Sequence, residues 1–114
     1  MEETFGEKLR ALRRAAKITQ RELAERVGVD FSYISKLEND RLPPPAAETV
    51  IRICEALGVT PDELLAASGK MPPQIQEDIG SSPAAIQFLR SAQVMKLSEA
   101  EWKQLSEQLK RLRD

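Results

Sequence analysis

The stretch from Thr19 to Asn39 constrains this chain most, because it holds two helical apolar patterns separated by a single glycine. The first pattern starts at a Thr-x-x-Glu capping box, in which side-chain and backbone groups satisfy each other at a helix start. Gly28 follows it, where helices often end through a left-handed conformation, and Asp30 can cap the second pattern. So short a turn lets two helices cross steeply. The predicted helices span 20–27 and 31–39.

The composition favours helices over the whole chain. Ala, Leu, Glu, Lys, Arg and Gln dominate, aromatic residues make up only 4%, and no alternating apolar run suggests a strand. A length of 114 residues allows one compact domain and an appendage. The fold class predicted is therefore all-α. Further helices are expected at 5–16, 46–57, 61–68, 83–94 and 99–113, starting at further capping boxes such as Thr4–Glu7, Thr60–Glu63 and Ser98–Glu101.

The chain divides into three predicted parts. Residues 1–69 form a five-helix domain, in which Cys54 lies on an apolar stripe with Val50, Ile51 and Leu57. Residues 70–82 form a proline-containing hinge with a weak helical turn at 74–79, and residues 83–114 form a small helical region.

The C-terminal helices carry apolar residues at helical spacing. Trp102, Leu105, Leu109 and Leu112 follow one another at coiled-coil spacing, but this seam is too short to stand alone. We expect it to form a dimer surface, and the alternative is that these helices fold back on the first domain. The expected dimer residues are Ile86, Leu89, Trp102, Leu105, Leu109 and Leu112.

Residue types that catalysis and metal binding need are scarce. The chain contains no histidine, which removes the commonest general base and metal ligand, and its one cysteine excludes an internal disulfide. No apolar run approaches 18 residues, and the Met-Glu-Glu start lacks the positive charge of a signal peptide. We predict no catalytic residues, no metal, no cofactor, no membrane contact and a cytoplasmic location.

Positive charge is gathered locally in a chain whose net charge is −1. Up to residue 70 there are 11 basic and 12 acidic side chains. The expected helix over 5–16 and the residue just after it nevertheless carry Lys8, Arg10, Arg13, Arg14 and Lys17 against Glu7. A solvated helix face would explain this cluster, but its place directly before the helix pair favours contact with phosphates.

The residues of the helix pair resemble a known family. The pattern Gln20-x-x-Leu-Ala-x-x-x-Gly28-Val, followed by Ile34-Ser and Glu38-Asn39, is similar to the lambda-repressor/Cro-like (XRE) helix-turn-helix family. The resemblance covers about residues 5–68 and implies a five-helix lambda-repressor-like DNA-binding domain. The loop after Glu38 is longer than the family pattern and holds three prolines.

The candidate DNA contacts lie at the two helix starts. The N-terminal end of the helix over 31–39 presents side chains suited to base edges in the major groove. For Phe31, the alternative role is packing against the helix over 20–27. These base-reading candidates are Phe31, Ser32, Tyr33 and Lys36. The family implies phosphate contacts for Gln20, which can also brace the second helix, and for Asn39. Location and charge add Arg13, Arg21 and Arg41.

The expected partner is a double-stranded DNA operator, bound by a dimeric repressor on a palindrome. The tail also resembles a subset of these regulators that an ImmA/IrrE-type metallopeptidase controls. Two alternatives stay open. One is an antitoxin or restriction-modification controller whose tail binds a toxin or other protein partner, and the other is an interaction adaptor that does not bind DNA.

Overall fold

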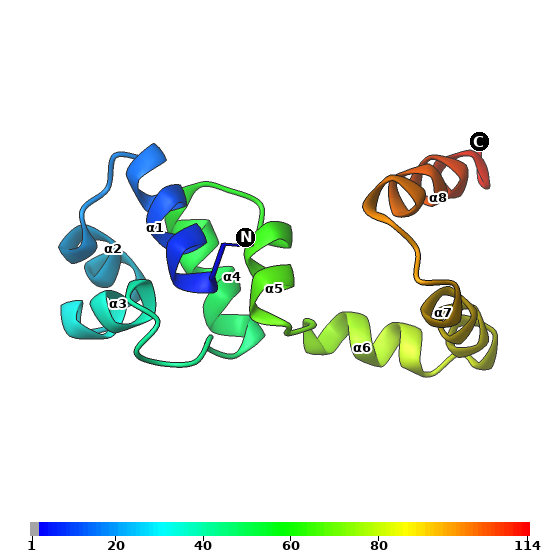
Figure 1. Ribbon diagram of the computed structural model, residues 1–114, viewed down its shortest axis with the longest axis horizontal. Helices are drawn as coiled ribbons and strands as arrows, with labels where there is room; N and C mark the ends of the chain where they lie inside the picture. The colour runs from blue at the N-terminus through cyan, green and yellow to red at the C-terminus, as the bar shows by residue number, and fades with distance from the viewer. Residues whose placement is uncertain (1–2) are drawn as a thin grey trace. The chain divides into compact units, whose positions relative to one another are not determined.

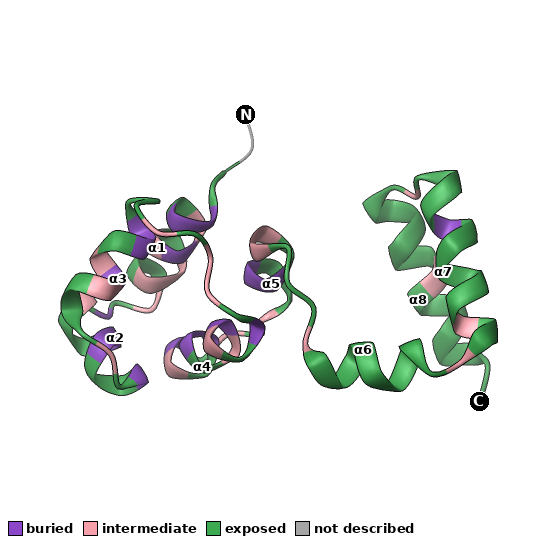
Figure 2. Ribbon diagram, turned by 90° about the horizontal axis from the view of Figure 1, so that it is seen from below, coloured by how far each residue is buried: buried purple, intermediate pink, exposed green. Residues whose placement is uncertain are grey.

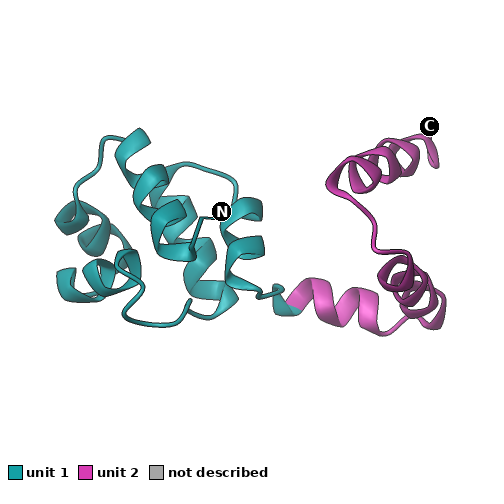
Figure 3. Cartoon of the chain, viewed as in Figure 1, with its two compact units in different colours: residues 1–73 teal, residues 74–114 magenta. Residues whose placement is uncertain are grey.

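The computed structural model describes residues 3–114, and all regular elements in this range are helices (Figure 1). The all-α prediction is therefore confirmed. The first two residues, which belong to the start that argued against a signal peptide, lie outside the described part. The chain forms two compact units, residues 1–73 and 74–114 (Figure 3). The helices are α1 (Phe5–Ala15), α2 (Gln20–Val27), α3 (Phe31–Glu38), α4 (Ala47–Leu57), α5 (Asp62–Ser68), α6 (Pro73–Gly80), α7 (Pro83–Met95) and α8 (Glu99–Arg111).

Capping boxes start three of these helices. The side chains of Thr4, Thr19 and Ser98 each accept a bond from the backbone of a glutamate three residues on, and that glutamate bonds back. A cap of this kind typically stabilises a helix by about 1 kcal/mol. The predicted box at Thr60–Glu63 is wrong, because Pro61 itself stands at the N-cap of α5 and no side chain caps the helix. The helix consequently starts at Asp62.

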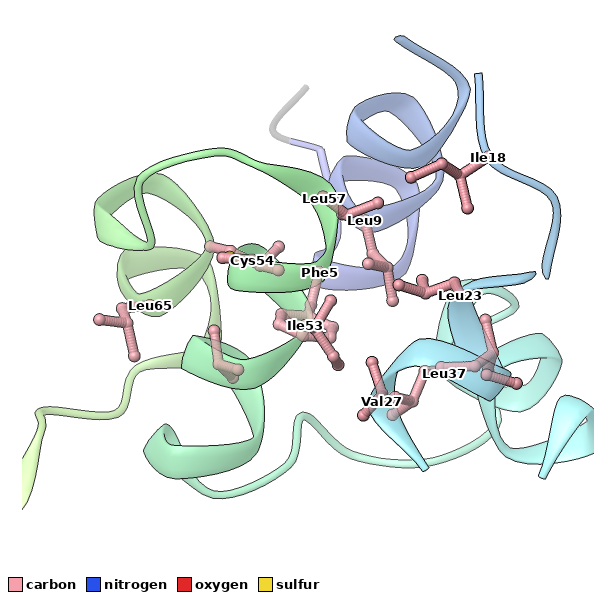
Figure 4. Close-up of a cluster of buried hydrophobic side chains, with 14 of the residues drawn as sticks. Phe5, Leu9, Ile18, Leu23, Val27, Leu37, Ile53, Cys54, Leu57 and Leu65 are labelled. Carbon is pink, nitrogen blue, oxygen red and sulfur yellow. The ribbon is translucent and has the colours of Figure 1, made fainter. Parts of the chain in front are cut away.

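The apolar core of the first unit draws on all five of its helices (Figure 4). Cys54 lies within it as predicted, and burial raises the pKa of its thiol. On α4 the prediction placed Ile51 inward, whereas Ile53 is the fully buried residue and Ile51 is half-buried. The buried stripe of α4 runs through Ala47, Val50, Cys54 and Leu57 and is completed by Ile53, so Ile51 lies at its opposite edge.

A close contact fixes the start of α1 against the end of α3. A Cβ atom on Gly6 would lie 2.5 Å from the carbonyl oxygen of Leu37 and 2.6 Å from that of Glu38. Asp40, which has a φ of 55°, accepts hydrogen bonds from the Gly6 N–H at 3.0 Å and the Thr4 hydroxyl at 2.6 Å. The chain just after α3 thus caps the first turn of α1.

The second unit holds α7, α8 and all of α6 except Pro73, and it has almost no core of its own (Figure 2). Ala92 is its only buried residue in the described chain. The segment predicted as a weak turn is the eight-residue helix α6. None of the helices within residues 3–114 combines the length and the apolar character that crossing a membrane requires.

Candidate nucleic-acid interface

The turn between α2 and α3 has the geometry that its glycine predicts. Gly28 has a φ of 84°, and the N–H groups of Gly28 and Val29 both donate to the carbonyl of Ala24, at 2.8 and 2.9 Å. This conformation is open to glycine at little cost and strained for other residues. Ala24 is buried, and α2 packs on α3. The turn and this small residue set the crossing of α2 and α3.

The start of α3 carries the four residues expected to meet bases. Phe31, Ser32 and Lys36 are exposed, while Tyr33 is half-buried and packs against the core. Asp30 stands at the N-cap position, as predicted, but its carboxylate makes no capping hydrogen bond. The first turn of α3 therefore has no side-chain cap, and its positive helix dipole is not offset by an acid bonded to it.

Glu38 is the only charged residue among those buried in residues 3–114, and its side chain is fully covered. Arg13 donates to both of its carboxylate oxygens, through Nε at 2.6 Å and a terminal nitrogen at 3.0 Å. Gln20 donates to it at 3.0 Å and Arg10 at 3.4 Å. These bonds fasten the end of α3 to α1 and to the first residue of α2.

The same contacts set the ionisation of the pair. Burial alone would raise the pKa of Glu38, but hydrogen bonds from Arg13, Gln20 and Arg10 and the charge of Arg13 outweigh it, so the pKa is lowered. The hydrogen bond to Glu38 raises the pKa of Arg13, against the opposing effect of burial. Both groups are therefore charged at neutral pH.

Three of the expected phosphate contacts already have partners within the protein, and one of them is Gln20, which donates to Glu38. Arg13 also donates to the carbonyl of Ile18 at 2.9 Å, so each of its three guanidinium nitrogens makes an internal hydrogen bond. The amide oxygen of Asn39 accepts from Arg10 at 2.7 Å, and its nitrogen donates to the Ser35 carbonyl at 2.9 Å. Arg21 and Arg41, in contrast, are exposed.

The starts of α2 and α3 and one face of α1 border an open basic concavity of about 680 Å³. Four arginines line it, so a localised positive surface exists on a domain with no net positive charge. Positive clefts of this kind concentrate polyanions. The lining residues are Arg10, Arg13, Arg14, Thr19, Gln20, Arg21 and Phe31.

Three features of the site were not predicted from sequence. The ion pair of Arg13 and Glu38 joins residues that lie far apart in the chain, and neither helical pattern signals it. Asp40 capping α1 is a second long-range contact. The third is a stacking contact, in which the guanidinium carbon of Arg21 lies 4.7 Å from the centre of the Phe31 ring. Packing of Phe31 on the helix over 20–27 was the alternative role expected for it, but the sequence did not indicate Arg21 as the partner.

Two curated relatives come from Bacillus subtilis. The chain is 39% identical over 67 residues to the "HTH-type transcriptional repressor RghR", covering 59% of this chain and 50% of that protein. It is 38% identical over 76 residues to the uncharacterized HTH-type transcriptional regulator RghRB, covering 64% and 55%. The chain thus matches about half the length of these relatives.

Solved structures share the fold. The P22 c2 repressor in complex with a synthetic operator is 35% identical, with a TM-score of 0.52 over 58% of this chain and 98% of that chain. A SinR/SinI protein complex is 20% identical, with a TM-score of 0.54 over 94% of this chain and 95% of that one, which shows a similar fold only. A family model described as "Helix-turn-helix domain" matches residues 4–67. The chain therefore belongs to the helix-turn-helix domain family, in its lambda-repressor-like form.

Proposed function

We propose that this chain is a sequence-specific DNA-binding transcriptional repressor that places α3 in the major groove of an operator. The observation that carries the proposal is the basic concavity of α1, α2 and α3 beside the exposed start of α3. Kinship with a protein named as a repressor and with a repressor solved on an operator supports it. This family comprises regulators rather than enzymes, which agrees with the prediction that the chain has no catalytic residues. Its expected place of action is chromosomal DNA in the cytoplasm.

The residues then take different roles in the proposed complex. Ser32 and Lys36 reach base edges from exposed positions, and Tyr33 adds an aromatic edge from its half-buried position. Arg41 and Arg14 contact phosphates from exposed positions, and Gln20 and Arg10 add contacts at the edge of the concavity beside their bonds to Glu38. Arg13 and Asn39 were expected to contact phosphates directly. Their internal hydrogen bonds support a different main role, which is to hold α3 and Arg10 in position.

We further propose that α7 and α8 pair two copies of the chain. Large apolar side chains are exposed on both helices, with Phe88 of α7 51%, Leu109 of α8 67% and Leu112, at the C-cap of α8, 77% exposed. Beside Trp102 and Leu105 they line a groove of about 370 Å³. A helical unit that buries only one alanine in the described chain leaves its apolar surface for an intermolecular partner. A second copy of the chain would cover this apolar surface and would also supply the second α3 that the other half-site of a palindrome needs.

Selection of binding sites from randomised duplex DNA tests the function. The full-length chain should enrich one palindromic sequence with half-sites spaced by about one helical turn, 10–10.5 base pairs. Recovery of a single unpaired half-site would support DNA binding but contradict the dimer, and would favour a different protein, such as a toxin or a metallopeptidase, as the partner of α7 and α8. Failure to enrich any sequence would contradict the repressor function and favour an interaction adaptor.

A further inference from the structure

The stacked pair formed by Arg21 and Phe31 joins the starts of the two helices of the motif. Arg21 is the second residue of α2 and Phe31 is the first residue of α3. The guanidinium carbon lies 4.7 Å from the ring centre, within the range of a cation–π contact. Phe31 is 39% exposed even with the guanidinium against it. The pair is therefore a surface feature and not part of the core.

Arg21 differs from Arg13 in having its hydrogen-bonding groups free. Within residues 3–114 it takes part in none of the ion pairs, which involve Arg10, Arg13 and Lys110. None of the side-chain hydrogen bonds in that range includes it, whereas Arg13 makes three with its guanidinium. The guanidinium of Arg21 is thus positioned by the ring while its N–H groups stay available to a ligand.

A positioned guanidinium suits the bidentate recognition of guanine. A phosphate can be neutralised by a mobile point charge, but guanine requires two N–H groups in one plane, aimed at O6 and N7. The contact with the ring positions the guanidinium and leaves its N–H groups free to reach O6 and N7. Both residues also line the basic concavity beside the exposed start of α3. Arg21 accordingly has the placement of a base-reading residue, in contrast to the phosphate contact expected from its charge.

Phe31 supplies the complementary apolar contact. In the major groove the 5-methyl group of thymine is the apolar feature that a phenylalanine can touch. The two side-chain groups are 4.7 Å apart, and successive bases on a DNA strand are separated by about 3.4 Å along the axis. The guanidinium and the ring are therefore spaced to contact two adjacent base pairs.

On the basis of the proposed function, we propose that Arg21 and Phe31 act as one unit that recognises a guanine next to a pyrimidine carrying a 5-methyl group. Arg21 donates to the guanine, and Phe31 packs on the methyl group. Thymine and 5-methylcytosine present the same methyl group at the same place, so either base can supply it. The unit would make the affinity of the protein depend on cytosine methylation where the site contains a cytosine–guanine step.

The first test changes only the DNA and uses the full-length chain on its selected duplex. Each thymine beside a guanine in a half-site is replaced by deoxyuridine, which lacks only the methyl group, and Kd is measured. At one position the affinity should fall about fourfold, the value of one buried methyl group. A thymine–guanine step converted to cytosine–guanine should lose the same factor, and 5-methylcytosine should restore it. Equal binding to all four duplexes would overturn the proposal.

The second test changes the protein and separates base recognition from phosphate contact. Arg21→Lys keeps the charge but loses the planar fork, so it should reduce discrimination against the wrong base at the guanine by about tenfold while keeping the salt dependence. Phe31→Ala should abolish the difference between thymine and deoxyuridine. If Arg21→Ala instead weakens every sequence equally and lowers the salt slope by about one, Arg21 contacts a phosphate and the proposal fails. Failure to select any site would contradict the repressor function itself, so the two failures are distinguishable.

Discussion

Nε of Arg13 lies 2.6 Å from the carboxylate of Glu38, and this pair joins the third turn of α1 to the last residue of α3. The Glu38 side chain has no exposed surface and that of Arg13 has 11%. Gln20, the first residue of α2, bonds to the same carboxylate. One buried charge therefore holds the three helices that form the proposed DNA surface, which links the stability of the domain to the geometry of its recognition helix.

Removing one member of this pair should be strongly destabilising. Glu38→Ala leaves the Arg13 guanidinium buried without its counter-charge, and we expect the free energy of unfolding to fall by about 3–5 kcal/mol. The double variant Arg13→Met with Glu38→Ala removes both charges and should lose less than the sum of Glu38→Ala and Arg13→Met measured singly. Urea unfolding followed by circular dichroism measures all of these values.

Arg10→Ala is the matched control for that series. Arg10 bonds to the same carboxylate at 3.4 Å but its side chain is 34% exposed, so its loss should cost no more than about 1 kcal/mol. Two results would show that Arg13 is not the main partner of Glu38. One is a double variant whose loss of unfolding free energy equals the sum of the two single losses, and the other is a loss for Arg10→Ala as large as that for the Arg13 variant.

The lowered pKa of Glu38 predicts a loss of stability in acid. Because the pKa is lower in the folded chain than in the unfolded chain, the ionised carboxylate contributes stability above the unfolded value of about 4.3. That contribution should decline as the pH falls from there through the folded pKa. The difference in unfolding free energy between the wild-type chain and Glu38→Gln should therefore stay constant from about pH 7 to pH 5 and shrink below about pH 4.3. A difference that grows in acid would mean that burial dominates and the pKa is raised.

Gly6 should not tolerate a methyl group. An alanine Cβ would lie 2.5 Å from the carbonyl oxygen of Leu37, and these backbone atoms can yield only if α1 and α3 separate. We expect Gly6→Ala to cost about 1–3 kcal/mol despite the better helix propensity of alanine. Gly80→Ala is the control, because Gly80 is also in a helix but has open space around it. Thermal unfolding that leaves Gly6→Ala as stable as the wild type would contradict the close contact.

Local signals allowed most of the first unit to be predicted, because each depends on residues within one or two turns. The boxes at Thr4 and Thr19 and the left-handed Gly28 are of this kind. What could not be predicted depends on residues distant in the chain. The bond from Gly6 to Asp40 and the ion pair of Arg13 with Glu38 arise only when α1 packs on α3. The assignment of Arg13 to phosphate followed its charge, since the sequence does not show where a partner lies.

Lys36 should contribute to specificity at a single base pair. It is exposed one turn beyond the start of α3. We expect Lys36→Ala to lose about 1–3 kcal/mol of discrimination at one position of the selected site and to leave other positions unchanged. Competition binding on duplexes mutated at each position measures this, with Lys70→Ala, an exposed lysine outside the five helices, as control. A uniform loss of affinity with a shallower salt dependence would identify Lys36 as a phosphate contact instead.

Charges placed on α8 should separate the proposed dimer without harming the fold. Leu109 and Leu112 are 67% and 77% exposed, so glutamate at either position disturbs no internal packing. In a dimer the same glutamates would be buried without partners, at a cost of several kcal/mol per buried charge. The double variant Leu109→Glu with Leu112→Glu should therefore be monomeric by analytical ultracentrifugation and should bind the palindrome more weakly, while keeping its affinity for a single half-site. Lys103→Glu, an exposed charge change on the same helix, controls for charge alone. A double variant that sedimented like the wild-type chain would show that α8 does not form the dimer contact.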